Sequence, residues 1–307
     1  MATVSLLRSL GRCQQVACHL KNVKILHQSY CFASTYCYET SEKYFKISML
    51  DGDRDGTAVM SMRHHKGVNS MGYSFMRQFL EAMEELKFKN QVRVLVLCSE
   101  VPKIFCAGAD LKERLVMPIP EVYGFVAMLR RAVSELQNLP MPTIAAIEGA
   151  AFGGGLEIAL GCDMRIASST AKLGLTETSL GIFPGAGGTQ RLPRLVGPSV
   201  AKELIFTSRR LSGWQALEKG IVNDCVDQNK TGDAAFHKAL ELAEEILPNA
   251  PIAVRLAKMA VNRGIEVDLE SGMRYEEAYY AQVIPTKDRM EGLVAFKEKR
   301  KPKYQGH

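Results

Sequence analysis

Glu157 differs from the other carboxyl groups of the sequence in the residues that surround it. It follows the glycines of GAAFGGGL and precedes IALGC. A helix over these residues is apolar on nearly every side, which predicts that the helix is buried. A buried carboxyl group without a partner is costly, so a functional role such as proton transfer is favoured for Glu157. The structural alternative is a first-turn glutamate that stabilises the helix dipole.

Three glycine-rich stretches could form a ligand site around this carboxyl group. They are FCAGADLKER at 105–114, GAAFGGGLE at 149–157 and GIFPGAGGTQRL at 181–192. None of them fits GxGxxG, GxxxxGK or GxSxG, which argues against the usual dinucleotide, nucleotide and serine hydrolase sites. Glycines before a helix leave backbone N–H groups open to a ligand, so two such loops could make an oxyanion hole. Tight turns without a ligand remain the alternative for either loop alone.

The blocks FCAGADLKE, AFGGGLEIALGCDMRIA and LGIFPGAGGTQRL, in this order and spacing, resemble the signatures of the enoyl-CoA hydratase (crotonase) family. The similarity runs from about Tyr44 to the C-terminus. It implies that the backbone N–H groups of Ala109 and Gly154 hold the thioester oxygen of an acyl-CoA. It also implies that Glu157 and Glu177 are the catalytic pair of a hydro-lyase, which adds water across the α,β double bond of an enoyl-CoA thioester. One carboxyl group would accept a proton from water while the other, protonated, serves the α-carbon.

The same resemblance implies contacts with the coenzyme A part of the substrate. Lys112 and Lys299 stand where the family's phosphate-binding lysines lie, and Phe296 would cover the adenine; ordinary exposed lysines are the alternative. No cofactor is expected, because coenzyme A belongs to the substrate. No metal site is expected either, because the pair His64-His65 has no third ligand at metal spacing.

Further segments favour one subgroup of the family. SEVPKIFCAGADLKER, QNKTGDAAF and the tail from Glu276 to Tyr304 are most similar to methylglutaconyl-CoA hydratases. This implies hydration of 3-methylglutaconyl-CoA to 3-hydroxy-3-methylglutaryl-CoA in leucine degradation. The sequence identifies no partner for the distal carboxylate of that substrate. A short-chain enoyl-CoA hydratase, or a hydratase-like paralogue of other acyl specificity, is the alternative.

Binding of AU-rich RNA, which a member of that subgroup performs through a lysine-rich helix, is a further reading. The matching segment of this sequence, residues 72–89, mixes Arg77, Lys87 and Lys89 with three glutamates. So mixed a charge pattern is not the cationic surface that RNA binding needs. The sequence therefore argues against RNA binding.

Alternating strands and helices are expected to position these residues. Strands are predicted over 44–50, 57–62, 92–98, 141–149, 164–168 and 171–175, and helices over 72–87, 122–139 and 153–163. From about residue 200 helices follow one another over 200–207, 212–219, 233–247, 252–262, 267–282 and 287–298, with Ser212 and Asp233 as N-caps. The alternation predicts an α/β fold with parallel strands. The resemblance implies a crotonase-type spiral of ββα turns, followed by a C-terminal helical region that builds a homotrimer or a homohexamer.

Three regions are predicted: a mitochondrial transit peptide over 1–38, the spiral core over 44–232 and the C-terminal helical region over 233–307. The first 38 residues hold four basic residues and no acidic one, and they lack a secretory h-region. They imply a protein of the mitochondrial matrix, with a disordered cytosolic tail as the alternative. Without them 39 − 4 = 35 basic residues face 33 acidic ones, and the net charge falls from +6 to +2. A charge this small steers few polyanions to the protein, and no apolar run is long enough to predict a membrane span.

Overall fold

Six strands form the main sheet of the computed structural model, which describes residues 42–307. In sheet order they are β1 Phe45–Met49, β2 Thr57–Met62, β3 Val94–Ser99, β5 Thr143–Ile147, β7 Met164–Ser168 and β10 Asp224–Val226. β1 and β2 are antiparallel and joined through a short 3-10 turn, η1 Gly52–Arg54, as the Asp-Gly pairs of this segment predict. Every other pairing in this sheet is parallel. The transit peptide predicted for residues 1–38 lies outside the described residues.

A second sheet of four short strands gives the chain its spiral course. Its strands are β4 Ile104–Cys106, β6 Ala150–Phe152, β8 Lys172–Gly174 and β9 Leu211–Ser212. Along the chain β3, β5 and β7 of the main sheet are followed by β4, β6 and β8 of the small sheet, and each such pair is followed by a helical segment. The chain therefore runs as repeated ββα turns, and the predicted α/β fold is confirmed.

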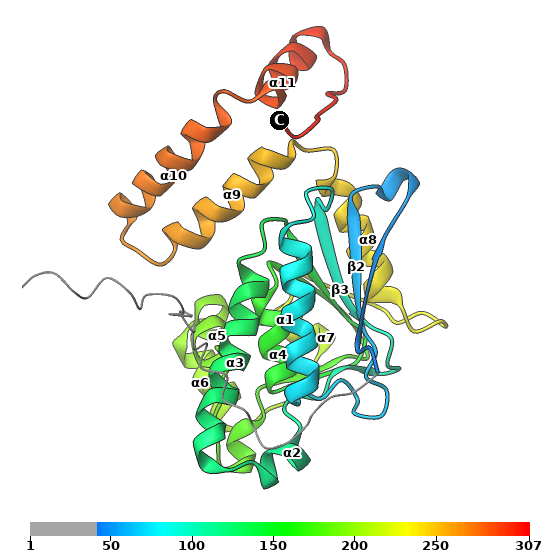
Figure 1. The fold of residues 1–307 in the computed structure, drawn as a ribbon, viewed down its shortest axis with the longest axis vertical. Helices are drawn as coiled ribbons and strands as arrows, with labels where there is room; N and C mark the ends of the chain where they lie inside the picture. The colour runs from blue at the N-terminus through cyan, green and yellow to red at the C-terminus, as the bar shows by residue number, and fades with distance from the viewer. Residues whose placement is uncertain (1–41) are drawn as a thin grey trace, which may run out of the picture. The chain divides into compact units, whose positions relative to one another are not determined.

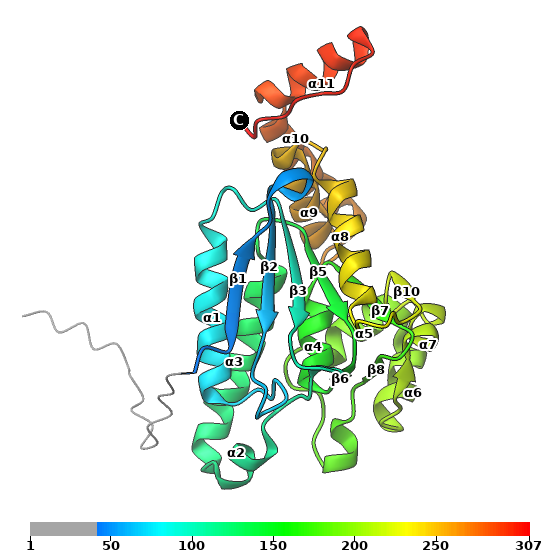
Figure 2. The same cartoon turned by 90° about the vertical axis from the view of Figure 1, so that its right-hand side faces the viewer.

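Helices cover both faces of the main sheet (Figure 2). α1 Tyr73–Lys87, α3 Ile119–Gln137 and α4 Gly154–Gly161 share one hydrophobic cluster with the sheet, and α8 Ala234–Ile246 shares a second cluster on the opposite face. Strand β3 shows the alternation: Leu95 and Leu97 belong to the first cluster, and Val94 and Val96 belong to the second. Because both faces are buried, these strands are continuous apolar runs in the sequence.

Helix α4 is buried over its whole length, including Glu157. Arg165 from β7, only 5% exposed, caps its C-terminal end. The guanidinium donates hydrogen bonds to the carbonyl oxygens of Ala159 at 3.3 Å, Cys162 at 2.8 Å and Ile221 at 2.8 Å. A cation at this end of a helix satisfies carbonyl groups that have no partner inside the helix. Arg165 thus fixes the helix that carries Glu157.

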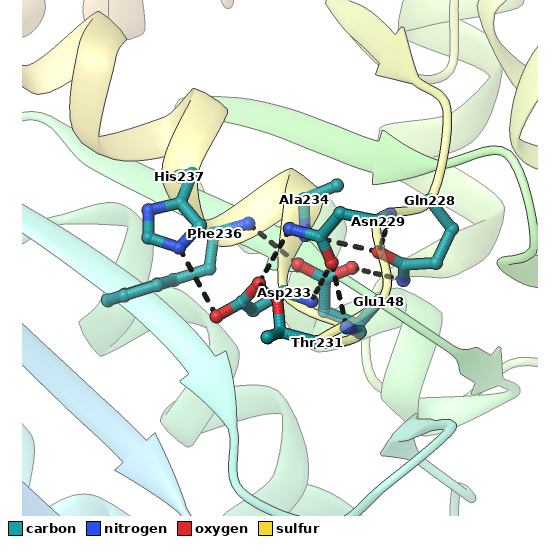
Figure 3. A network of polar contacts seen from close by, with 9 residues as sticks. Glu148, Gln228, Asn229, Thr231, Asp233, Ala234, Phe236 and His237 are labelled. Atoms are coloured by element: carbon teal, nitrogen blue, oxygen red, sulfur yellow. Dashed lines mark hydrogen bonds and ion pairs between the residues drawn. The ribbon is translucent and has the colours of Figure 1, made fainter.

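The N-terminus of α8 is held by a polar network that begins after β5 (Figure 3). Glu148 accepts hydrogen bonds from the backbone N–H of Phe236 and from the side chain of Gln228, both at 2.7 Å. Asp233 is the N-cap residue, as predicted, but its side chain makes no capping hydrogen bond and instead accepts one from Asn229. Glu148, a residue distant in sequence, therefore supplies the anion at this helix end.

Short elements connect the remaining parts and include several that line the site described below. They are α2 Leu111–Val116, η2 Glu177–Leu180, α5 Gly188–Val196, α6 Pro198–Phe206 and α7 Gly213–Glu218. α7 begins with the predicted N-cap Ser212, which forms a reciprocal capping box with Gln215.

Three helices follow α8: α9 Pro251–Gly264, α10 Leu269–Val283 and α11 Lys287–Glu298 (Figure 1). No residue of α9 or α10 is buried. The two helices approach each other closely, because a Cβ on Gly272 would lie 3.3 Å from the carbonyl oxygen of Gly264. Lys258 ties α9 to the core through 2.8 Å contacts with the carboxylate of Asp163 and the carbonyl oxygen of Met141.

None of the helices over residues 42–307 combines the length and the apolar character that crossing a membrane requires. The described residues 42–307 belong to one compact unit, and α8 packs on β3, β5 and β7 of the main sheet. The division of this unit at residue 233 remains a prediction.

Replacing Arg165 by methionine is expected to lower the free energy of unfolding by about 2–3 kcal/mol, because three buried carbonyl oxygens lose a charged donor. Urea unfolding followed by circular dichroism measures this change. Arg274→Met is the matched control, since Arg274 is exposed and pairs only with Glu270 on its own helix; its effect is expected within about 0.5 kcal/mol. Equal stability of the two variants would contradict the capping role of Arg165.

Candidate active site

Two backbone segments bring unpaired N–H groups side by side at the start of α4. Gly108 adopts a φ of 94°, and a Cβ there would lie 2.7 Å from the carbonyl oxygen of Phe152 and 3.6 Å from the nitrogen of Gly154. Only glycine tolerates this conformation and this close approach. Within residues 42–307 the N–H groups of Ala109 and Gly154 donate to no protein acceptor. The predicted oxyanion-hole residues therefore lie on adjacent segments with their donors free.

Glu157 lies in the first turn of α4 and is 2% exposed. Its Oε1 accepts hydrogen bonds from the backbone N–H of Ala186 at 2.8 Å and of Gly188 at 2.7 Å. Gly188 leaves room for this contact, because a Cβ there would lie 3.1 Å from Oε1. Burial raises the pKa of Glu157, and the two N–H donors partly offset that rise because they stabilise the carboxylate.

Glu177 begins η2 and is 9% exposed. Its carboxyl group lies against the start of α4, since a Cβ on Gly153 would be 3.2 Å from its Oε1. Its Oε2 is buried without a hydrogen-bond partner among residues 42–307. Burial, followed by the charge of Glu157, raises the pKa of Glu177 to about 7. The two carboxyl groups therefore differ in their donors. Two backbone N–H groups of another loop favour the carboxylate form of Glu157, whereas Glu177 has only its own backbone N–H among the described residues.

One cavity of about 340 Å³ joins the two carboxyl groups to the two free N–H groups. Most of its other lining side chains are apolar: Met71, Leu111, Leu115, Val126, Leu129, Leu180, Ile182 and Phe183, with Arg114 as a cationic exception. An apolar cavity with few converging polar groups fits an acyl chain whose reacting carbonyl meets the donors.

The model of the enoyl-CoA hydratase/isomerase family matches residues 52–307 of the chain. The chain belongs to this family. The predicted family, its fold and an enzyme of the hydratase class are thereby confirmed.

Relatives and a solved structure agree with this assignment. Human methylglutaconyl-CoA hydratase, mitochondrial, is 52% identical over 266 residues, which cover 87% of this chain and 78% of the relative. Mouse enoyl-CoA hydratase domain-containing protein 2, mitochondrial, is 55% identical over 261 residues, which cover 85% of this chain and 88% of the relative. The crystal structure of an enoyl-CoA hydratase from Bacillus anthracis has a TM-score of 0.81 and 45% identity, and the match covers 86% of this chain and all 100% of that one. The names of the first two relatives support the prediction of a mitochondrial protein.

Arg191 of α5 belongs to this enoyl-CoA hydratase-type site, and the sequence analysis missed it. Its guanidinium donates to the carbonyl oxygen of Ala186 at 3.1 Å and to the side chain of Gln137 on α3 at 2.7 and 2.9 Å. It therefore fixes the loop whose N–H groups hold Glu157. In the sequence Arg191 is only a cation three residues after Gly188. This pattern is too common to identify Arg191 as a residue of the site.

The predicted contacts with coenzyme A do not converge within one chain. Lys112 is exposed on α2 beside the cavity, whereas Lys299 and the 87% exposed Phe296 lie on or just after α11. Figure 1 places α2 and α11 far apart in this unit.

His64 packs its ring 4.1 Å from that of Tyr44, and no group of three candidate metal ligands occurs among residues 42–307.

Glu177→Gln is expected to stabilise the fold at about pH 8 by about 1–3 kcal/mol. The carboxyl group titrates at its ordinary value of 4.5 in the unfolded chain and at about 7 in the folded protein. The folded state therefore loses stability as pH rises through this window, and the amide removes that loss. Thermal melts across this pH range should show the gain at high pH and none at about pH 4.5. The exposed control Glu84→Gln should behave as wild type, and a gain in Glu177→Gln that is independent of pH would argue against the raised pKa.

Proposed function

We propose that this enzyme hydrates 3-methylglutaconyl-CoA to 3-hydroxy-3-methylglutaryl-CoA. The observation that carries the proposal is the convergence of two buried carboxyl groups and two free backbone N–H groups in one apolar cavity. The substrate is supported by similarity to methylglutaconyl-CoA hydratases of human, mouse and rat, at 51–52% identity.

The proposed roles follow from what each group can do with a proton. The N–H groups of Ala109 and Gly154 donate to the thioester oxygen, where enolate charge develops. Glu157, the carboxylate, accepts a proton from water as the water oxygen bonds to the β-carbon. Glu177, the protonated acid, gives its proton to the α-carbon. The product has gained the elements of water, Glu157 is now protonated and Glu177 is deprotonated. Transfer of one proton from Glu157 to Glu177, directly or through solvent, restores the starting state.

Hydration is redox-neutral, so the proposed reaction needs no cofactor beyond the coenzyme A carried by the substrate. Lys112, Lys299 and Phe296 remain the proposed contacts for that part of the substrate. The distance between α2 and α11 in one chain fits contacts made from two copies, because α11 of a neighbour could approach the cavity. The proposed assembly is a homotrimer or a homohexamer, in which the unburied helices α9 and α10 would contact other copies. The proposed compartment is the mitochondrial matrix.

A hydratase of other acyl specificity is the second candidate. The observation in its favour is the 55% identity to mouse enoyl-CoA hydratase domain-containing protein 2, whose name states no acyl group. RNA binding is not favoured. The cations of α1 and its C-terminal end face carboxylates, with Arg77 and Glu81 3.9 Å apart and Lys87 and Glu135 3.9 Å apart, which leaves little net charge for phosphates.

The hydration assay compares the wild type with Glu157→Gln and Glu177→Gln on 3-methylglutaconyl-CoA and crotonyl-CoA. Each substitution is expected to lower kcat on the order of 10²- to 10⁴-fold, because a positioned acid or base contributes that much. Loss of the conjugated thioester absorbance measures the rate, and Glu84→Gln serves as the control, because Glu84 is exposed and outside the cavity lining. A wild type that is inactive on both thioesters would refute the proposed hydratase activity. A preference for crotonyl-CoA would refute only the proposed substrate. Loss of activity in only one of the two variants would indicate single-base, isomerase-like chemistry.

The pH profile of kcat tests the division of roles between the glutamates. Since the pKa of Glu177 is raised to about 7, its acid form is present below that pH and is lost above it. The rate is therefore expected to fall about tenfold per pH unit on the alkaline side, and the residual rate of Glu177→Gln is expected to lack this limb. A wild-type rate that rises with pH through this region would instead identify Glu177 as the base.

A further inference from the structure

Arg114 is the one cationic side chain among the described residues that line the cavity shared by Glu157 and Glu177. The hydration chemistry proposed above assigns it no role. Apart from these three residues the cavity lining carries no formal charge. The cavity thus holds a lone guanidinium that the reacting thioester does not require.

The short helix α2 sets the direction of Arg114. Asp110 caps the helix by accepting from the backbone N–H groups of Lys112 and Glu113 at 3.0 and 3.1 Å. Glu113 in turn accepts from the N–H of Tyr73 at 3.0 Å, which ties α2 to the start of α1. Residues two apart on a helix point in different directions, so Arg114 lines the cavity while Lys112 lies outside its lining.

The guanidinium of Arg114 has weak partners. Its central carbon lies 5.1 Å from the ring centroid of Phe125 on α3, and one nitrogen lies 3.8 Å from the sulfur of Met117. Within residues 42–307 it forms no ion pair with a carboxylate. Burial lowers the pKa of Arg114 and the charge of Glu113 opposes that effect, but a guanidinium stays protonated throughout the working pH range. Its remaining donors are therefore charged, oriented by the aromatic ring and open to a ligand.

An anionic acyl chain would otherwise be disfavoured in this cavity. Glu177 carries a negative charge there above about pH 7, and a carboxylate on the substrate would add another. A guanidinium can bind such a group through two parallel hydrogen bonds. A neutral acyl chain of the same length would gain nothing from it.

We infer that Arg114 binds the carboxylate at the far end of the acyl chain, so that the site selects CoA monothioesters of unsaturated dicarboxylic acids. This inference rests on the proposed function and extends it from the reacting bond to the rest of the acyl group. A phosphate of coenzyme A is the other anion that could meet Arg114, and the experiment separates the two sources.

The test compares full-length wild type, Arg114→Met, Arg114→Lys and the control Arg130→Met. Arg130 lies exposed on α3 and outside the cavity lining. The substrates are glutaconyl-CoA and crotonyl-CoA, which differ by one carboxylate, together with 3-methylglutaconyl-CoA. Arg114→Met is expected to lower kcat/KM for the two carboxylate-bearing thioesters on the order of 10- to 100-fold, mainly through a higher KM. The kcat/KM for crotonyl-CoA is expected to fall less than about threefold. Arg114→Lys should lie between it and the wild type, and Arg130→Met should match the wild type.

A binding measurement separates this inference from the hydration chemistry. Calorimetry with glutaryl-CoA and butyryl-CoA, which have no double bond to hydrate, measures binding without turnover. Arg114→Met should weaken the binding of glutaryl-CoA alone, by the same order of magnitude as the expected loss in kcat/KM. If the wild type binds glutaryl-CoA in this Arg114-dependent way but hydrates nothing, the proposed function fails and the inference stands. An equal loss for both ligands would mean a phosphate contact or a general defect, and no loss for either would mean that Arg114 touches no anion. Either result would overturn the inference, as would a wild type that hydrates only crotonyl-CoA.

Discussion

The pair of hydrogen bonds that Glu157 accepts from the backbone of Ala186 and Gly188 is the interaction on which the site depends. A carboxylate with 2% of its surface exposed would otherwise lose its strongest compensation for the lost hydration. The loop that provides these donors must itself be fixed, and Arg191 fixes it from α5 while bonding to α3. The helix that carries Glu157 must be fixed too, and Arg165 caps its far end. Arg165, which is buried, and Arg191, which is half-buried, thus hold one buried glutamate without forming a hydrogen bond to it.

This arrangement explains why Glu157 and Glu177 differ although both are buried glutamates. Backbone donors and the charge of Arg191 favour ionisation of Glu157, whereas Glu177 has an unpartnered oxygen and the charge of its neighbour to oppose ionisation. The charge of Glu157 thus adds to burial in raising the pKa of Glu177. Backbone geometry therefore produces the asymmetry that the proposed acid–base roles require. The raised pKa of Glu177 lowers the stability of the fold at high pH.

Much of this could be predicted from the sequence, because the signals were local. Continuous apolar runs predicted the buried strands, and apolar residues all round α4 predicted the burial of Glu157. The N-cap at Ser212 was predicted for the same reason, and the capping box that it forms with Gln215 was found in the structure. Long-range contacts were not readable. Glu148 replaces Asp233 as the anion at the start of α8, and Arg191 and Gln137, 54 residues apart in sequence, hold the loop at Ala186. The predicted contacts Lys299 and Phe296 lie far from Lys112 in one chain, a separation that no local pattern encodes.

The position of Arg114, on which the proposed acyl specificity rests, is another long-range arrangement. In the sequence it is one charge in the run LKER, indistinguishable from the exposed lysine two residues earlier. In the structure Asp110 and Glu113 orient the helix, and Phe125 supports the guanidinium from a different helix. The reacting end of the cavity is built from backbone N–H groups and two glutamates, whereas the cation comes from a short helix at its border. If Arg114 binds the acyl group as proposed, a change in α2 would alter the preferred acyl group and leave Glu157, Glu177 and the free N–H groups in place, because none of them takes its position from Arg114.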